Sequence, residues 1–390
     1  MNKKLIALAV ASAFAAPAAA LAQASNVQIY GGAYFEYGYV KQGALASGNM
    51  PNADIIQSPG SAIGVRGEEA LGGGLSAWFQ CESTAGTAGA TAVGGGGVFC
   101  GRNSALGMKG AFGNAYVGNW DTPFKRSIGL KYATDVSFFG ASALMYGASA
   151  SAIGRAAPGT WARRENQTMF YDTPSWNGFQ AMGALSTPTV AQNAVTSNTS
   201  GAKARLWSLG ATYTNGPLFV GAAYENHSNF QPAANGTAGA ATGFAGNDNA
   251  FTLSARYQFG PLEAGVGYTK QKFETAPLTS ADVSAVHLVG SWAVQGPHTV
   301  QLGYTKANST GGSYAGVIGP RVYNAGAGNT GASLLLAEYQ YAFSKRTRGS
   351  IGYARVSNDS AATYSIMGFN SPTQGGVNQD GVAMSFKTTF

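Results

Sequence analysis

The residues whose chemistry is easiest to predict are two cysteines, which can form a disulfide. Cys81 and Cys100 are the only cysteines of the 390-residue chain, and they lie at opposite ends of a long segment rich in glycine and alanine. An even pair in an exported chain, placed where two hairpin strands approach, predicts a disulfide that closes the loop. The histidines His227, His287 and His298 have no spacing typical of metal ligands. We therefore expect a Cys81–Cys100 disulfide and no metal site.

Enzyme chemistry finds no support in the sequence. No nucleophile elbow, carboxylate pair in a definable cleft or phosphate-binding glycine loop is recognisable, and the glycine runs are typical of turns. The charged residues are scattered singly, without a nucleic-acid-binding motif. We expect no catalytic residues, no cofactor and no nucleic-acid partner.

The amino end has the pattern of a secretory signal peptide. A positively charged start precedes an apolar run over residues 5–16, which is too short to serve as a membrane anchor. Cleavage after Ala22 or Ala24 would make residues 1–24 the signal peptide and 25–390 a single domain. No later stretch reaches about 18 uninterrupted apolar residues. The exported chain is therefore secreted, periplasmic or an outer-membrane barrel.

Alternation of apolar and polar residues predicts strands along the remaining chain. In the last strand Val382, Met384 and Phe386 fall on one face, Ser385 falls on the other, and the sequence ends at Phe390. A membrane barrel needs this strand to pair with the first one, because pairing removes both sheet edges. The 56 glycines, 12% aromatic residues and only 11% charged residues also fit short strands and turns.

Short and long connections alternate between these segments. Short turns at one end and long loops at the other are typical of outer-membrane barrels, and the segment count predicts an all-β antiparallel transmembrane barrel of about sixteen strands. The short turns are 110–113, 174–177, 215–217, 260–261, 295–298 and 344–347, and the long loops are 41–57, 85–98, 188–204, 229–248, 309–331 and 359–379.

The mature chain resembles Gram-negative general porins of the betaproteobacterial and neisserial type. Six segments in family order carry the resemblance: VQIYG (27–31), GEEALGGGL (67–75), YDTP (171–174), NGPL (215–218), YAFSKRT (341–347) and Phe390. The resemblance implies a sixteen-stranded homotrimer in outer-membrane lipid, with short periplasmic turns, long extracellular loops and the third loop folded into the pore. It also implies that the barrel-assembly machinery recognises the strand ending at Phe390.

This chain departs from the family pattern at the pore. Asn119 and Phe170 occupy positions where the family usually has arginine. The charge selectivity of the family therefore cannot be transferred to this chain.

The third loop, about residues 121–159, is rich in aromatic and small residues and is expected to form a constriction. Between residues 121 and 165 six basic residues stand against three acidic ones, which predicts a mild anion preference. The expected pore-lining residues are Glu36, Arg66, Glu82, Lys109, Asp121, Arg126, Lys131, Asp135, Arg164 and Arg348. The alternative for each charge is simple solvation of the lumen or loops.

The expected function is passive diffusion of small hydrophilic solutes and inorganic ions through an outer-membrane channel. Two alternatives remain open. One is a solute-specific channel with a saturable binding site, and the other is an adhesin-type or enzymatic barrel.

Overall fold

The computed structural model describes residues 27–43, 52–86, 99–130, 144–145, 161–187, 205–230, 237–238, 246–276, 279–313, 316–318, 321–323, 328–366 and 374–390. The expected signal peptide, Lys131 and Asp135 lie outside these residues.

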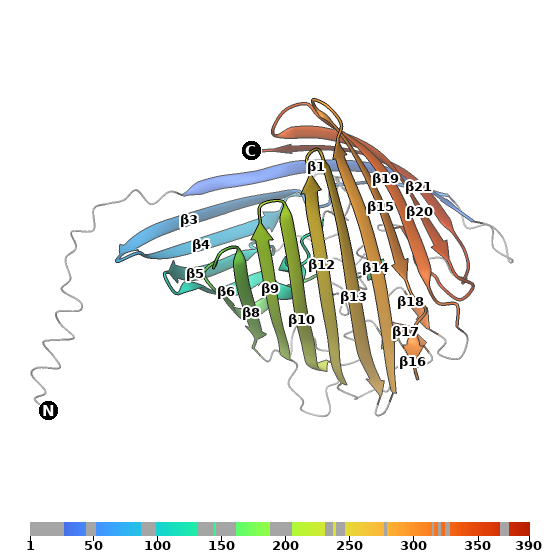
Figure 1. Ribbon diagram of the computed structural model, residues 1–390, viewed down its shortest axis with the longest axis horizontal. Coiled ribbons are helices and arrows are strands. Elements are labelled where there is room, and N and C mark those ends of the chain that lie inside the picture. The colour runs from blue at the N-terminus through green and yellow to red at the C-terminus, as the bar shows by residue number, and fades with distance from the viewer. Residues whose placement is uncertain are drawn as a thin grey trace, which may run out of the picture.

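Sixteen antiparallel strands of the described chain form a closed barrel (Figure 1). They are β1 (Gln28–Gln42), β3 (Ala62–Gly72), β4 (Leu75–Thr84), β5 (Ser104–Gly110), β6 (Gly113–Asp121), β7 (Arg164–Asp172), β8 (Phe179–Ser186), β9 (Arg205–Asn215), β10 (Leu218–Phe230), β12 (Gly246–Phe259), β13 (Leu262–Ala276), β14 (Thr279–Ala293), β15 (His298–Ala307), β19 (Ala332–Ala342), β20 (Thr347–Asn358) and β21 (Gln379–Thr389).

Pairing between the first and last strands closes the barrel. β1 and β21 lie side by side (Figure 1), with Phe35 opposite Phe386 in the register. Phe390 extends this pairing, since its N–H donates to the Gly31 carbonyl at 3.0 Å. This pairing removes the free sheet edges that the first and last strands would otherwise present. The predicted role of the last strand in closing the sheet is confirmed.

The two-residue period of the strands separates an apolar outer face from a polar inner face. On β1, Phe35, Tyr37 and Tyr39 are exposed on the outside, whereas Tyr34 and Glu36 are buried on the inside. The same division holds on β21, where Val382, Met384 and Phe386 point outward. An apolar outer surface of this kind fits a lipid environment, in which each strand presents every second residue. The predicted barrel class is confirmed.

The predicted turns join the strands at one end, and the long connections join them at the other. The first long connection differs from expectation, because β1 continues to Gln42 and β2 (Ala53–Gln57) pairs with β1 over Glu36–Val40. The expected loop 41–57 is therefore partly strand. The polar residues of this segment led to the prediction of a loop. In the structure, pairing with β1 satisfies the backbone hydrogen-bonding groups of both segments.

Smaller elements belong to the long connections. β16 (Gly311–Gly312) pairs with β14, while β11 (Thr237–Ala238), β17 (Gly316–Ile318) and β18 (Arg321–Tyr323) form a three-stranded sheet. A single turn of helix, α2 (Pro123–Arg126), begins the third loop. No helix within the described ranges is long and apolar enough to cross a membrane.

Candidate pore constriction

The third loop enters the barrel directly after β6. Thr122 caps α2 by accepting a hydrogen bond from the Lys125 N–H, and Pro123 occupies the first helical turn, where its missing N–H costs little. The Phe124 N–H donates to Ser208 Oγ on β9 at 3.0 Å, and Ser254 Oγ on β12 donates to the Ser127 carbonyl at 3.1 Å. These bonds hold the beginning of the loop against the inner wall.

Glycines on the wall make this close approach possible. A Cβ atom added to Gly221 would lie 2.0 Å from the Ser127 carbonyl oxygen, and one added to Gly267 would lie 2.7 Å from Leu130 Cδ1. A larger residue at either position would displace the loop from β10 or β13. The described residues at the start of the third loop therefore lie against the inner wall of the barrel.

The return of the loop is also anchored on the wall. Trp161 is fully buried, and its ring stacks on His227 of β10 with centroids 4.2 Å apart. Arg163 and Glu165 form a buried ion pair at 2.7 Å, and the Thr122 N–H donates to the Arg163 carbonyl. Both ends of the loop are therefore tied together and to the barrel.

Arg126 is held by a wall carboxylate that the sequence did not identify. Its terminal nitrogens donate to both oxygens of Asp172 on β7, at 2.7 and 2.8 Å, and one of them also donates to Tyr116 Oη at 2.8 Å. Two parallel charge-assisted bonds fix both position and orientation. The charge of Arg126 is accordingly compensated in place.

A second ionic cluster lies where the third loop leaves β6 and returns to β7. Asp121 pairs with Lys125 at 2.6 Å and with Arg164 at 3.5 Å, and it accepts a hydrogen bond from the Asn103 amide. Arg164 Nε also donates to Asn103 Oδ1 at 2.7 Å. Burial lowers the pKa of Lys125, although Asp121 opposes this shift. The described loop cations thus face carboxylates and do not form an isolated positive patch.

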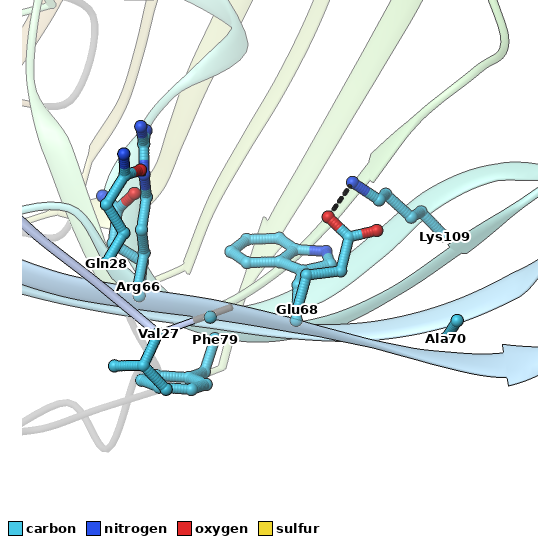
Figure 2. A pocket seen from close by; sticks show the side chains of 10 residues that line it. Val27, Gln28, Arg66, Glu68, Ala70, Phe79 and Lys109 are labelled. Carbon is cyan, nitrogen blue, oxygen red and sulfur yellow. Dashed lines mark hydrogen bonds and ion pairs between the residues drawn. The ribbon is translucent and has the colours of Figure 1, made fainter. Parts of the chain in front are cut away.

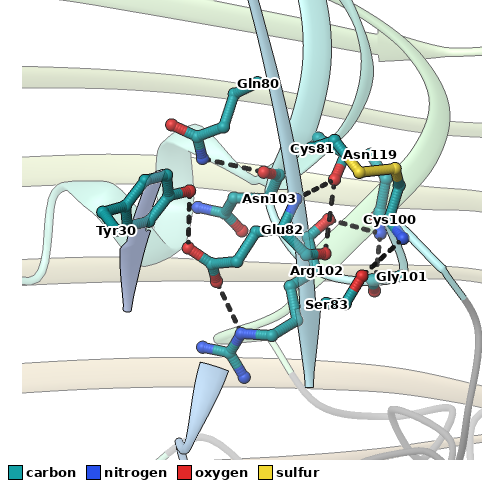
Figure 3. Close-up of a disulfide and its surroundings, with 11 residues drawn as sticks. Tyr30, Gln80, Cys81, Glu82, Ser83, Cys100, Gly101, Arg102, Asn103 and Asn119 are labelled. Atoms are coloured by element: carbon teal, nitrogen blue, oxygen red, sulfur yellow. Dashed lines mark hydrogen bonds and ion pairs between the residues drawn. A yellow bond between two sulfur atoms is a disulfide. The ribbon is translucent and has the colours of Figure 1, made fainter. Parts of the chain in front are cut away.

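The strand leading to the second long loop carries the predicted disulfide. Cys81 and Cys100 are bonded, with Cα atoms 4.7 Å apart, and the Cys100 N–H donates to Ser83 Oγ at 2.9 Å (Figure 3). Beside them Glu82 pairs with Arg102 at 2.5 Å and accepts from Tyr30 Oη at 3.0 Å. The disulfide is confirmed, and the partners of Glu82 show that it belongs to the inner face.

Arg66 and Lys109 lie on the inner wall, as the alternation predicts. Figure 2 shows both side chains rising from the same face, together with Gln28 and Glu68. Lys109 Nζ pairs with Glu68 at 2.6 Å. Arg66 donates through Nε to Gln28 Oε1 at 2.9 Å, and its guanidinium lies 5.0 Å from the centre of the Tyr30 ring.

Arg348 has a second cation as its neighbour. It lies opposite Lys387 on β21 in the register, and Lys387 in turn lies opposite Tyr34. Each of the three is two residues away from a buried inner-face residue of its own strand, so all three lie on the lumen side. Glu36, also on the inner face, accepts a hydrogen bond from the Gln57 amide at 3.2 Å.

Aromatic side chains surround Phe170, one of the two positions where the resemblance would place an arginine. Phe170 stacks on Tyr116 with ring centroids 4.9 Å apart. The rings of Trp78 and Trp120 also pack on Tyr116, with centroid distances of 5.4 and 5.6 Å. Phe170 thus belongs to an aromatic part of the inner wall, whereas the Asn119 amide donates to the carbonyls of Gly101 and Arg102 beside the second long loop, at 3.0 Å each. Trp78 lies on the inner face of β4, opposite Glu68 in the register.

Two wall residues that matter, Asp172 and Trp78, were not identified from the sequence. Each lies on the inner face two residues from Phe170 or Gln80, so continued alternation from these residues was the signal that could have found them.

Comparison with known proteins agrees with this architecture. Residues 7–361 match the family model described as Gram-negative porin. An outer membrane porin protein of Bordetella pertussis is 28% identical over 69% of this chain and 69% of its own length. Outer membrane porin protein 32 of Delftia acidovorans is 26% identical over 100% of both chains.

A solved structure shares the fold. The anion-selective porin from Comamonas acidovorans superposes with a TM-score of 0.69 at 22% identity, covering 94% of this chain and 100% of the other.

Proposed function

The chain belongs to the Gram-negative porin family and forms an outer-membrane channel for passive diffusion of small hydrophilic solutes and ions, and we propose that this channel mildly prefers anions. The observation that supports the anion preference is a pair of cations on the inner wall, on strands other than those that hold the start of the third loop. Among the described residues, Arg66 and Lys387 form no ion pair with a carboxylate, whereas the described loop cations are paired.

The two wall cations lie on the strands that flank β1. Lys387 is on β21 and Arg66 on β3, and β1 lies between them and supplies Gln28 and Tyr30 as the neutral partners of Arg66. Anions passing this wall are attracted, while cations are repelled. Because exposed charges are screened within about 10 Å at 0.1 M salt, the preference is confined to ions near the wall.

The reversal potential in a planar bilayer under a potassium chloride gradient tests this proposal. The double variant Arg66→Gln/Lys387→Gln should shift the potential toward cation preference while the channel stays open. Lys270→Gln, which removes an outward-facing cation on β13, is the control and should leave the potential unchanged. Potassium preference of the unaltered channel at low salt would overturn the proposal.

Three further features belong to the same proposal. We infer that residues 1–24 are removed as a signal peptide, that the barrel assembles as a homotrimer, and that the assembly machinery recognises the strand ending at Phe390. The family resemblance supports the last two. Native mass spectrometry of the purified protein measures the copy number and the mature amino terminus together, and a monomer would contradict the trimer.

A further inference from the structure

A hollow on the inner wall is bordered by an aromatic ring and by a cation that has no acidic partner among the described residues. Arg66, Glu68, Trp78, Gln80 and Lys109 border it (Figure 2). Val27 and Phe79 border it as well, but Figure 2 places their side chains on the opposite side of the β3 ribbon. The hollow lies toward the short-turn end of β3, β4 and β5.

Trp78 lies close over the wall. A Cβ atom added to Gly107 would be 2.6 Å from both Cε2 and Nε1 of the indole, so the bare glycine backbone is what allows the ring to lie there. The indole N–H donates to Asn114 Oδ1 at 2.8 Å, and Tyr116 and Trp120 contact the ring. The ring is therefore fixed in orientation, and it borders the hollow while its polar atom is already engaged.

The charges around the ring are not equivalent. Lys109 is neutralised by Glu68, whose second oxygen accepts from Ser76 Oγ at 2.8 Å. Arg66 uses Nε on the neutral Gln28 and lies over Tyr30, and no carboxylate among the described residues accepts from its terminal nitrogens. One cation with a planar pair of donors is thus left to a solute.

The spacing of ring and cation defines the solute. Arg66 is opposite Gln80 and Glu68 is opposite Trp78, so Arg66 and Trp78 are diagonal neighbours on one face. Such neighbours are about 7–8 Å apart, within reach of long and aromatic side chains. A flat ring stacked on the indole can direct a carboxylate on its edge toward the guanidinium.

We propose that this wall is a saturable binding site for aromatic monocarboxylates of the benzoate class. The site goes beyond diffusion, which requires no such site, but it rests on the barrel conducting ions. A neutral sugar fits less well because Lys109, Glu68 and the indole N–H are already paired. An inorganic anion would use Arg66 and leave the ring without a role.

Partial block of chloride current by benzoate in a planar bilayer tests the site. In the unaltered channel, block should level off with benzoate concentration, while acetate and benzyl alcohol, which lack the ring or the charge, should block much less. Trp78→Leu and Arg66→Gln should each raise the half-blocking benzoate concentration about tenfold, the loss expected from one stacking or charge-assisted contact. Each variant should still conduct chloride.

Matched controls separate the site from general lumen charge. Lys387→Gln removes a lumen cation away from the hollow, and Trp292→Leu removes an outward-facing indole on β14, so both should keep the benzoate block within about twofold. Should Trp78→Leu fail to insert, Trp78→Phe and Arg66→Gln carry the test, with Phe weakening the block less than Arg66→Gln does.

Three results would overturn the site: block that rises without levelling off, equal block by acetate, or an equal effect of Lys387→Gln and Arg66→Gln. A protein that conducts no ions would contradict the channel itself, whereas a conducting channel without benzoate block would contradict the site alone.

Discussion

Arg126 and Asp172 form a two-pronged ion pair, with nitrogen–oxygen distances of 2.7 and 2.8 Å, that joins α2 of the third loop to β7. The side chain of Asp172 is 8% exposed, so solvent screens the pair only weakly. Two residues that are 46 positions apart in the sequence thereby fix one end of the loop and cancel each other's charge in the lumen.

Breaking this pair should change selectivity in opposite directions according to which partner is removed. Asp172→Asn leaves Arg126 uncompensated and should strengthen anion preference, whereas Arg126→Gln leaves the carboxylate and should weaken it. The double variant should return near the original reversal potential. Proteolysis of the third loop measures its stability in the single and double variants. The coupling free energy between Arg126 and Asp172 in this measurement should be about 1–3 kcal/mol. Additive single-variant effects would contradict the compensation.

The disulfide should stabilise its loop without determining the barrel. The bond spans a sequence separation of 19, for which chain entropy gives about 3 kcal/mol. Replacing Cys81 and Cys100 by Ser should speed proteolysis of the second long loop and leave heat-resistant barrel yield unchanged. Intact mass spectrometry checks the bond directly, because the unreduced protein should be two hydrogens lighter than the reduced one. A large fall in the barrel yield of the Ser variant would show that the barrel needs the disulfide in order to fold.

Deleting Phe390 should impair assembly. Phe390 exchanges backbone hydrogen bonds with Gly31, at 3.0 and 3.3 Å, beyond the last pair of the β1–β21 ladder. Removing it shortens the seam that closes the barrel, so the amount of folded protein in outer-membrane fractions should fall several-fold. Phe259→Ala, which removes a comparably exposed aromatic side chain from β12, is the control and should assemble normally. Equal yields of the deletion and the unaltered protein would argue against a role of Phe390.

Alkaline pH should weaken the anion preference. Burial lowers the pKa of Lys125 below its ordinary value of 10.5, so this loop cation loses its proton at a lower pH than an exposed lysine does. As the neutral amine forms, Asp121 keeps its charge and the local balance becomes more negative. Reversal potentials measured between about pH 7 and pH 10 should therefore drift toward cation preference. Lys125→Arg, which stays charged, should reduce the drift, and an unchanged drift in this variant would assign it to other groups.

The barrel class, the inner and outer faces, the turns and the disulfide could all be predicted from the sequence. These features are local: a period of two assigns each side chain to a face, and glycine- or proline-containing turns end strands. Arg66 and Lys109 could be assigned to the lumen because they continue that period. Cys81 and Cys100 could be paired because a hairpin brings the two ends of the second long loop together.

Which charges compensate one another depends on contacts that form only in the folded barrel. The excess of basic residues in the third loop predicted a mild anion preference, but it did not show which carboxylate each cation meets, and Arg126 meets Asp172 because the loop turns into the barrel. The pairing of β2 with β1 and the position of Trp78 over Gly107 likewise depend on which residues face each other across neighbouring strands, which alternation alone does not assign. Contacts across the lumen have no sequence period, because they join segments whose separation is set by barrel curvature and by the path of the loop.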